Sequence, residues 1–323
     1  RSSIPASIRS CIAMRIAQVS DTHGDTTGTA SALAAIRSIQ DIDLVVHTGD
    51  ISHDTFSDSI EYTDILKPFA VCVGNHDMLL DKGAISTGYR WDLQPTQEEA
   101  YQKYFRDNSA GITIEPGTTY WYKDLKDCRV IGIDYTARND AYYNEWYWLE
   151  KLLVECLSNN VPVFLCSHQI CEYAVLQETC DFTYDTYFYD WTMYAHDVGF
   201  SVYPFMNKSY ELVTEYAERG LNVICWIFGH EHADGAFISG NKKNRFPMVC
   251  CGSSVHDQYN DVYRSHTSNY VTDAVINLYE WSTGTQSLCI TRVGPTACST
   301  GRLRNMIAFN YDTGTFISRE ARG

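Results

Sequence analysis

Residues 16–23 of the chain read Ile16-Ala17-Gln18-Val19-Ser20-Asp21-Thr22-His23, a short apolar run that ends on two metal-binding side chain types. The run itself is typical of a buried strand. Four more such runs are each followed by Asp, Asn or His, and they cover residues 44–46, 70–73, 161–166 and 223–228. Because ligands bind outside the carboxyl ends of the strands in open α/β sheets, these five strand ends predict a single site.

The candidate metal ligands at these strand ends are Asp21, His23, Asp50, Asn75, His168, His230 and His232. Carboxylate and amide oxygens and neutral imidazoles suit divalent transition metals, and no thiolate joins the set. Side chains alternate along an extended chain, so Asp21 and His23 point the same way. The same holds for His230 and His232, while Glu231 points away. An Asp between two metals can give one oxygen to each and hold them about 3.5–4 Å apart.

Each of these residues also has a structural interpretation when it is taken alone. His168 could be a hydrogen-bonded core histidine, Asp50 a turn residue and Asn75 a helix cap. No structural role requires the full ordered set, which favours a dimetal site. The histidines that do not fit the ligand pattern are His47, His53, His196 and His256. Of these, His47 lies on a strand, where core packing or support of the ligands is expected.

The order of motifs D-x-H, GD, GNHD, an isolated His and GH-x-H over residues 14–256 resembles the calcineurin-like metallophosphoesterase family, on its class III phosphodiesterase-like side. The resemblance implies an α/β fold in which two mixed β-sheets pack as a sandwich flanked by helices. The metal site is then expected at the carboxyl ends of the strands. By the family pattern, one metal is held by Asp21, His23, Asp50 and His232. The second is held by Asp50, Asn75, His168 and His230, so that Asp50 bridges the two.

The resemblance further implies a metal-dependent phosphoesterase whose metal-bridging hydroxide attacks the phosphoester. Asp50 and His76 are the expected catalytic residues, and His76 protonates the leaving group or stabilises the transition state. The cofactors are two divalent ions, with Mn favoured and Fe, Zn, Co or Ni compatible. We favour a small-molecule or nucleotide phosphodiester as substrate. The alternatives are a phosphomonoesterase, a nuclease, or a non-hydrolytic scaffold that retains the fold.

Two features of the sequence bear on these alternatives. Scaffold relatives typically lose ligands, whereas this chain retains His76, His230 and His232. The phosphatase branch orients its catalytic histidine with a carboxylate three residues after the bridging Asp. Here that position is His53, followed by Asp54 as a possible substitute. The difference disfavours a phosphatase-like site and leaves the orienting partner of His76 unassigned.

Bulk composition limits the partners of the protein. The 323 residues are 45% hydrophobic and carry a net charge of −15, with no basic cluster denser than residues 242–245. Nucleic acid binding relies on clustered Lys and Arg, so a small phosphoester is the expected substrate. No run approaches the roughly 18 apolar residues of a membrane span, and a cytoplasmic location is expected. The sequence does not indicate an oligomeric state.

The twelve cysteines mostly fall inside apolar strand patterns, where free Cys behaves as a small hydrophobe. Disulfides are therefore not expected, and Cys171 with Cys180 is the least implausible pair. Residues 1–13 lack a signal-peptide pattern and are predicted to be an N-terminal extension. Residues 14–323 are predicted to form a single metallophosphoesterase domain.

Periodicity predicts helices over residues 28–40, 56–66, 95–105 and 144–157, with strands at 119–122 and 129–134. After His232 the pattern predicts further strands at residues 236–238, 248–251, 270–279, 288–293 and 303–309. An aromatic-rich insertion covers about residues 170–206 and is either a lid or binding wall, or a self-packed surface subdomain. Arg138 and Asn139 could contact a phosphate, although a solvated loop is the simpler interpretation.

Overall fold

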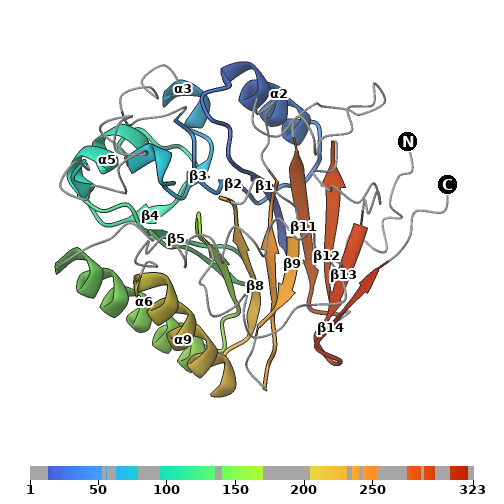
Figure 1. The fold of residues 1–323 in the computed structure, drawn as a ribbon. Helices are drawn as coiled ribbons and strands as arrows, with labels where there is room; N and C mark the ends of the chain where they lie inside the picture. The colour runs from blue at the N-terminus through green and yellow to red at the C-terminus, as the bar shows by residue number, and fades with distance from the viewer. Residues whose placement is uncertain are drawn as a thin grey trace, which may run out of the picture.

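Two seven-stranded mixed sheets form the centre of the computed structural model, which describes residues 14–52, 56, 63–78, 95–134, 140–169, 204–230, 235–239, 243–252, 275–284, 287–294 and 306–318 (Figure 1). The strands of the first sheet are, in order, β14 (Thr315–Ser318), β13 (Met306–Asn310), β12 (Ser287–Val293), β11 (Ile276–Ser282), β1 (Met14–Val19), β2 (Leu44–His47) and β3 (Ala70–Val71). Strands β1, β2 and β3 are parallel, and the remaining pairs of this sheet are antiparallel.

The strands of the second sheet are, in order, β4 (Thr113–Ile114), β5 (Trp121–Asp124), β6 (Arg129–Gly132), β7 (Val163–Cys166), β8 (Val223–Phe228), β10 (Pro247–Cys250) and β9 (Gly235–Ile238). Here β6, β7, β8 and β10 are parallel. The first sheet therefore has its parallel strands at one edge, whereas the second has a parallel centre with antiparallel margins. The predicted two-sheet α/β fold is confirmed.

Two helices begin at capping residues. The side chain of Asp25 accepts the Gly28 backbone N–H (2.8 Å) at the start of α2 (Thr26–Arg37). Thr96 and Glu99 form a capping box at the start of α5 (Gln97–Tyr104), with two reciprocal bonds to backbone N–H groups. The other helices among the described residues are α3 (Thr63–Leu66), the short η2 (His76–Met78), α6 (Asp140–Asn159) and α9 (Pro204–Glu218). In Figure 1, α6 and α9 lie side by side below the second sheet, on the opposite side from α2 and α3.

Four of the described elements were not expected from periodicity, namely α9, the short helix η2 and the short strands β4 and β14. Residues 204–206, at the end of the predicted aromatic insertion, lie in α9, while residues 170–203 fall outside the described part of the chain. Of the predicted helix over residues 56–66, the structure describes the end as α3, because residues 57–62 lie outside the described part of the chain.

The sheets are joined by polar side chains that cross the apolar core beneath the strand ends. The Trp121 indole N–H donates to the Val71 carbonyl (2.6 Å). Gln18 donates to the Phe228 carbonyl (2.9 Å) and accepts from the Tyr279 hydroxyl (2.5 Å). All of these side chains are fully buried. The ends of the central strands from both sheets are therefore held at one rim.

A second apolar cluster lies between the second sheet and helices α6 and α9, and includes Leu149, Leu153, Val213 and Trp226. Eight cysteines of the described residues are free, and seven of them are buried. Cys171 and Cys180 lie outside the described residues. Within the part of the chain that the structure describes, no helix is long and apolar enough to cross a membrane.

Candidate metal centre

The predicted ligands come together at the rim where the parallel strands end. Asp21 follows β1, Asp50 follows β2 and Asn75 follows β3 in the first sheet. His168 follows β7 and His230 follows β8 in the second. His23 and His76 join them from the loops after β1 and β3. His232, His53, Asp54, Arg138 and Asn139 all lie outside the described residues.

Four residues form what we call the His168 cluster, namely Asp50, Asn75, His168 and His230. Nε2 of His168 lies 3.0 Å from Asn75 Oδ1, 3.3 Å from Asp50 Oδ1 and 3.2 Å from His230 Nδ1. Nδ1 of His230 lies 2.9 Å from the same Asn75 oxygen. Two nitrogens and two oxygens thus converge on one small volume, which is the donor set expected around a divalent ion.

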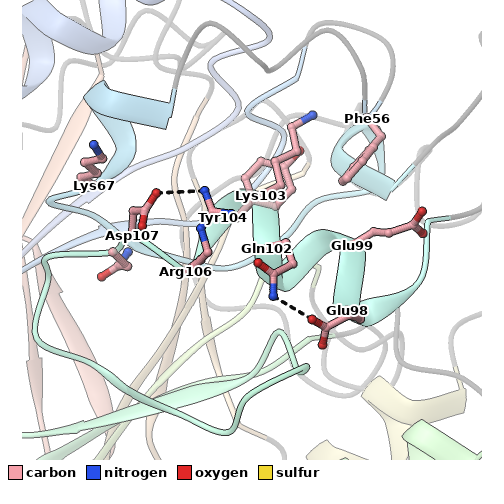
Figure 2. A pocket seen from close by; sticks show the side chains of 10 residues that line it. Phe56, Lys67, Glu98, Glu99, Gln102, Lys103, Tyr104, Arg106 and Asp107 are labelled. Carbon is pink, nitrogen blue, oxygen red and sulfur yellow. Dashed lines mark hydrogen bonds and ion pairs between the residues drawn. The ribbon is translucent and has the colours of Figure 1, made fainter.

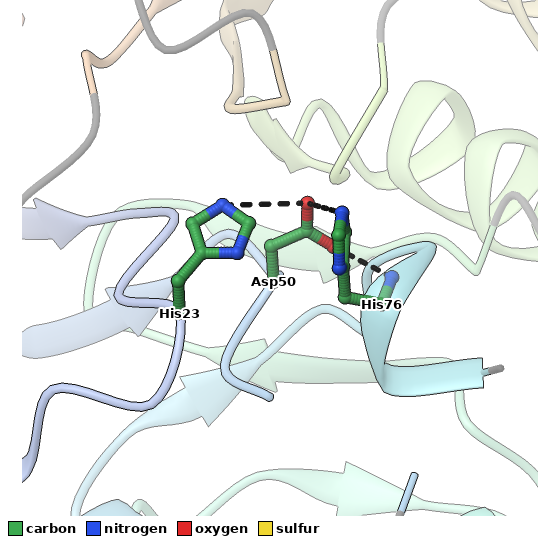
Figure 3. Close-up of side chains that lie close together, drawn as sticks. All are labelled: His23, Asp50 and His76. Atoms are coloured by element: carbon green, nitrogen blue, oxygen red, sulfur yellow. Dashed lines mark hydrogen bonds and ion pairs between the residues drawn. The ribbon is translucent and has the colours of Figure 1, made fainter. Parts of the chain in front are cut away.

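Three residues form the His23 cluster, namely His23, Asp50 and His76. The Asp50 carboxylate lies between the two imidazoles (Figure 3), with Oδ2 at 3.9 Å from Nε2 of His23 and 4.0 Å from Nε2 of His76. The two rings meet edge to face, with centroids 4.8 Å apart. Asp50 therefore turns Oδ1 towards one cluster and Oδ2 towards the other.

Asp21 is fully buried and links the two sheets at this rim. Its two carboxylate oxygens accept the backbone N–H of His230 at 3.1 Å each, and the Ser20 hydroxyl donates to one of them. The carboxylate is consequently fixed beside both the loop after β1 and the loop after β8. The role of Asp21 as a ligand of the first ion stays a prediction.

The protons of the His168 cluster indicate that it needs a positive charge. Nδ1–H of His168 donates to the Thr48 carbonyl (2.6 Å), which leaves Nε2 facing the acceptor oxygens of Asp50 and Asn75. Burial alone would lower the pKa of His168, but the carboxylate of Asp50, its hydrogen bond and Asp21 outweigh burial and raise the pKa to about 9. A divalent ion would satisfy the same oxygens and nitrogens, so the residues present fit a metal.

Asp50 is ionised despite its burial. Burial would raise its pKa, but the neighbouring His168, His76 and His23 hold the pKa well below its usual range. A carboxylate shared by two cations must be in this charged form. The electrostatics of the site and its geometry therefore agree.

The backbone at the rim is held in an uncommon conformation. Left-handed φ values of 50°, 39°, 51° and 73° occur at Asp21, His23, Asp50 and His230. This region is sparsely populated by residues other than Gly, and such backbones concentrate at functional sites. The turns redirect each strand end so that its side chain faces the shared site.

Glycines in the motifs leave room for the carboxylates. A Cβ at Gly74 would overlap the backbone nitrogen and Oδ1 of Asp50. A Cβ at Gly229 would overlap the Ser20 hydroxyl and lie 2.6 Å from Asp21 Oδ2. Any larger residue at these positions would displace a candidate ligand.

Asp77 is a supporting residue that the sequence analysis did not identify. Its fully buried carboxylate accepts backbone N–H groups from Ile51 (2.9 Å), Ser52 (2.8 Å) and Gly74 (2.8 Å). It therefore ties the loop after β2, which carries Asp50, to the loop after β3. The available signal was the carboxylate of GNHD, directly after His76.

His47 supports the site from below, in keeping with the sequence interpretation. Its Nδ1 accepts the Gly49 backbone N–H (3.2 Å), so its proton lies on Nε2, which faces the Thr22 hydroxyl at 3.0 Å. Burial and then the nearby His168 lower its pKa to about 3. His47 is accordingly neutral and connects the loops after β1 and β2.

Two further acidic residues lie next to each other, Asp134 at the end of β6 and Glu145 on α6. Both are fully buried, and the Asp134 backbone N–H donates to Glu145 Oε1 (2.7 Å). Burial, followed by the Asp134 carboxylate, raises the pKa of Glu145 well above its ordinary value. Among the described residues, the groups of side chains that could hold a metal ion lie in the His23 and His168 clusters, and neither cluster contains Asp134 or Glu145.

A cavity of about 590 Å³ lies along α5 and contains none of the candidate ligands (Figure 2). Its charged side chains are mixed, and two of its cations are paired with carboxylates, Lys67 with Asp64 and Arg106 with Asp107. It therefore offers no net charge to a phosphate. The rim of the parallel strands remains the candidate site.

Comparison with known proteins identifies the family of the chain. The sequence model of the calcineurin-like phosphoesterase family matches residues 14–234. A dimetal phosphatase from Danio rerio has a similar structure, with a TM-score of 0.52 and 10% identity over 88% of this chain and 96% of that chain. A metallophosphoesterase from Sphaerobacter thermophilus aligns with a TM-score of 0.35 and 13% identity over 87% and 88% of the two chains. No curated protein matches the chain by sequence. Because the family model covers well over half of the sequence, the chain belongs to the calcineurin-like phosphoesterase family.

Proposed function

We propose that this phosphoesterase hydrolyses a small-molecule or nucleotide phosphodiester with two divalent ions, and that Mn²⁺ supports the reaction in vitro. One observation carries the proposal: Asp50 presents Oδ1 to His168 and Oδ2 to His23 and His76. A carboxylate that is turned to two donor clusters in this way is suited to sharing two metal ions.

The ligand assignment follows the two clusters. One ion is assigned to Asp21, His23, Asp50 and His232. The other is assigned to Asp50, Asn75, His168 and His230. Ions bound there would supply positive charge to the phosphoryl oxygens and lower the pKa of water towards neutrality. Asp50 would hold the two ions in place, because the loops after β2 and β3 fix its backbone and its carboxylate.

His76 is assigned the proton transfer to the leaving oxygen. Its side chain is 23% exposed, more than His23 or His168, so it stands at the open side of the centre. Its backbone N–H donates to Asp50 Oδ1 (3.0 Å), which holds the residue against the bridging carboxylate. As an imidazolium, it can donate a proton to a departing alkoxide.

Charge supports a small diester over the other substrates. The net charge of −15 disfavours nucleic acid, which needs clustered cations. A phosphodiester carries one negative charge and a monoester close to two, so the acidic protein repels the diester less. The replacement of the phosphatase-branch carboxylate by His53 points the same way.

The test compares bis(p-nitrophenyl) phosphate with p-nitrophenyl phosphate, using metal-stripped protein reconstituted with Mn²⁺. We expect the diester to be hydrolysed faster, with Asp50→Asn as the inactive control. Preference for the monoester would make the protein a phosphatase and refute the diester assignment. Absence of both activities in protein that binds no metal would refute hydrolysis itself and support the scaffold alternative.

A further inference from the structure

Thr48 directly follows β2 and connects the buried core with a candidate ligand. It is fully buried and is not itself a candidate ligand. Its hydroxyl lies 2.9 Å from the side-chain nitrogen of Gln18 and 2.8 Å from the hydroxyl of Ser20. The Ser20 hydroxyl in turn donates to the carboxylate of Asp21. Four polar side chains therefore form one chain of hydrogen bonds, which ends on Asp21.

The direction of this chain is set at Gln18. A glutamine amide has N–H donors on one side and an acceptor oxygen on the other. The Phe228 carbonyl, which can only accept, lies 2.9 Å from the Gln18 nitrogen. The Tyr279 hydroxyl donates to the Gln18 oxygen (2.5 Å), and burial keeps its proton in place by raising the pKa of Tyr279 well above its ordinary value. The amide is thus fixed with its nitrogen towards Thr48, which must accept from it.

The Thr48 hydroxyl has one proton to give and two oxygens within reach. The Ser20 hydroxyl lies at 2.8 Å and the Val19 carbonyl at 3.5 Å. Only the shorter contact falls in the usual range for a hydrogen bond between oxygens. Thr48 therefore donates to Ser20, and the single proton of Ser20 goes on to Asp21. The hydrogen bonds run in one direction, from the core towards the candidate ligand.

This direction strengthens the last hydrogen bond of the chain. A hydroxyl that accepts one hydrogen bond is a better donor of the next, because bonds in a chain polarise one another. A bond from a hydroxyl to a carboxylate is also charge-assisted. The Asp21 carboxylate is then held on one side by Ser20 and on the other by the backbone N–H of His230, at 3.1 Å from both oxygens.

We propose that Thr48 is a positioning residue for Asp21: its hydroxyl, oriented by Gln18, donates to Ser20 and so holds the Ser20 hydroxyl on the Asp21 carboxylate. The expected effect on an ion rests on the proposed function, whereas the hydrogen bonds themselves do not. The main-chain carbonyl of Thr48 also lies 2.6 Å from Nδ1 of His168, and a change of the Thr48 side chain leaves that carbonyl in place. The effect should therefore be confined to the ion assigned to Asp21.

The experiment uses the full chain with two substitutions that separate the hydroxyl from the shape of the side chain. Thr48→Val keeps the shape and removes the hydroxyl, whereas Thr48→Ser keeps the hydroxyl and removes a methyl group. The matched control is Thr214→Val on α9, where the Thr214 hydroxyl donates to the Tyr210 carbonyl of the same helix (2.9 Å). A packing role for Thr48 predicts the larger effect in Thr48→Ser, and the positioning role predicts it in Thr48→Val.

The first readout is the affinity for Mn²⁺, measured by calorimetric titration. We expect Thr48→Val to weaken one ion by about 10-fold, the lower end of the range for losing a hydrogen-bond partner behind a ligand. Thr48→Ser and Thr214→Val should equal the wild type. In a His23→Ala background, which is expected to keep only the ion of the His168 cluster, adding Thr48→Val should leave the affinity unchanged. Equal affinities in the two Thr48 variants, or a further loss in that background, would overturn the proposal.

The second readout is the ¹H NMR resonance of the Ser20 hydroxyl in serine-labelled protein, identified by its absence in Ser20→Ala. A proton donated in a strong hydrogen bond to a carboxylate resonates far downfield. We expect this resonance in the wild type and in Thr48→Ser, and an upfield shift in Thr48→Val. An unchanged resonance in Thr48→Val would overturn the proposal. Wild-type protein that binds no Mn²⁺ would instead refute the proposed function, and the NMR result would then decide by itself whether Thr48 strengthens the bond to Asp21.

Discussion

The two halves of the candidate centre share Asp50 but differ in how tightly they are built. In the His168 cluster the facing atoms lie 2.9–3.3 Å apart, and the His168 side chain is fully buried. In the His23 cluster the Asp50 contacts are 3.9 and 4.0 Å, and the side chains of His23 and His76 are 13% and 23% exposed. One half is a closed ligand cage and the other opens to solvent. We expect the enclosed half to bind its ion more tightly and the open half to admit water and substrate.

Removal of the shared charge should have the largest effect, since both halves depend on it. Asp50→Asn is expected to lose both ions and to reduce turnover by at least about a thousandfold, on the scale of losing a principal electrostatic group. Metal content by mass spectrometry and diester hydrolysis are the measurements. Asp64→Asn, on an exposed carboxylate, is the matched control and should be unchanged. Two ions retained in Asp50→Asn would contradict the bridging assignment.

Single-ligand variants should separate the two halves. His23→Ala is expected to reduce the bound ions from about two to one and to leave the tighter ion in place, since His23 lies only in the open half. His168→Ala should remove the tighter ion instead, because Nε2 of His168 is central to the enclosed half. Calorimetric titration with Mn²⁺ gives the stoichiometry and affinity of the remaining ion. Identical remaining affinities in the two variants would mean that the halves do not differ as their geometry indicates.

His76 sharpens the contrast, because it belongs to the open half as a proton donor. We expect His76→Ala to retain both ions and to lower turnover by about 10²–10⁴-fold for a diester with an alkyl leaving group. A p-nitrophenolate leaving group needs little protonation, so its loss should be smaller. The ratio of the two losses is the measurement. Equal losses for both leaving groups would argue against proton donation by His76.

Glu145 tests whether a carboxyl at the same rim stays outside the centre, and the expected effect is the smallest. Its folded-state pKa lies above the ordinary 4.5, so the folded protein binds the proton more tightly than the unfolded chain does. Stability should therefore fall as pH rises from about 4.5 towards the raised pKa, by about 1.4 kcal/mol per pH unit. Glu145→Gln should flatten this slope while the protein still binds two ions.

Chemical unfolding at several pH values measures that slope. The exposed Glu218→Gln is the matched control and should retain the wild-type slope. If stability depended on pH in Glu145→Gln as it does in the wild type, another titrating group would be the cause of the stability loss. Loss of an ion in Glu145→Gln would place this carboxyl inside the centre and break the distinction between the clusters and the acidic pair.

The residues at the strand ends could be predicted from the sequence, because each residue of a metal-ligand type stands directly after an apolar run that forms a strand. Asp21, Asp50, Asn75, His168 and His230 all lie where that reasoning placed them. The carboxylate of Asp50, after β2, faces histidines from both sheets, and its bridging role stays a prediction.

The residues that support the ligands could not be predicted in the same way. Asp77 accepts backbone N–H groups from its own loop and from a separate loop, and Gln169 contacts His230 through a neutral amide that has no sequence signature. Both depend on how loops distant in sequence meet in space. Helix α9 was missed for a different reason. Its buried Tyr210, Val213 and Ala217 have helical spacing, but they follow an aromatic segment whose irregular pattern dominated the interpretation.

The left-handed turns at Asp21, His23, Asp50 and His230 limit how this centre could be transferred to another protein. A designer who copied only the seven side chains onto the edge of another α/β sheet would place them on ordinary extended backbones. The chelating atoms would then point to one face of the sheet or the other, away from a common point. The transferable unit is the set of main-chain turns together with the glycines that let them approach, and a scaffold should be chosen by its loop conformations before its residues are changed.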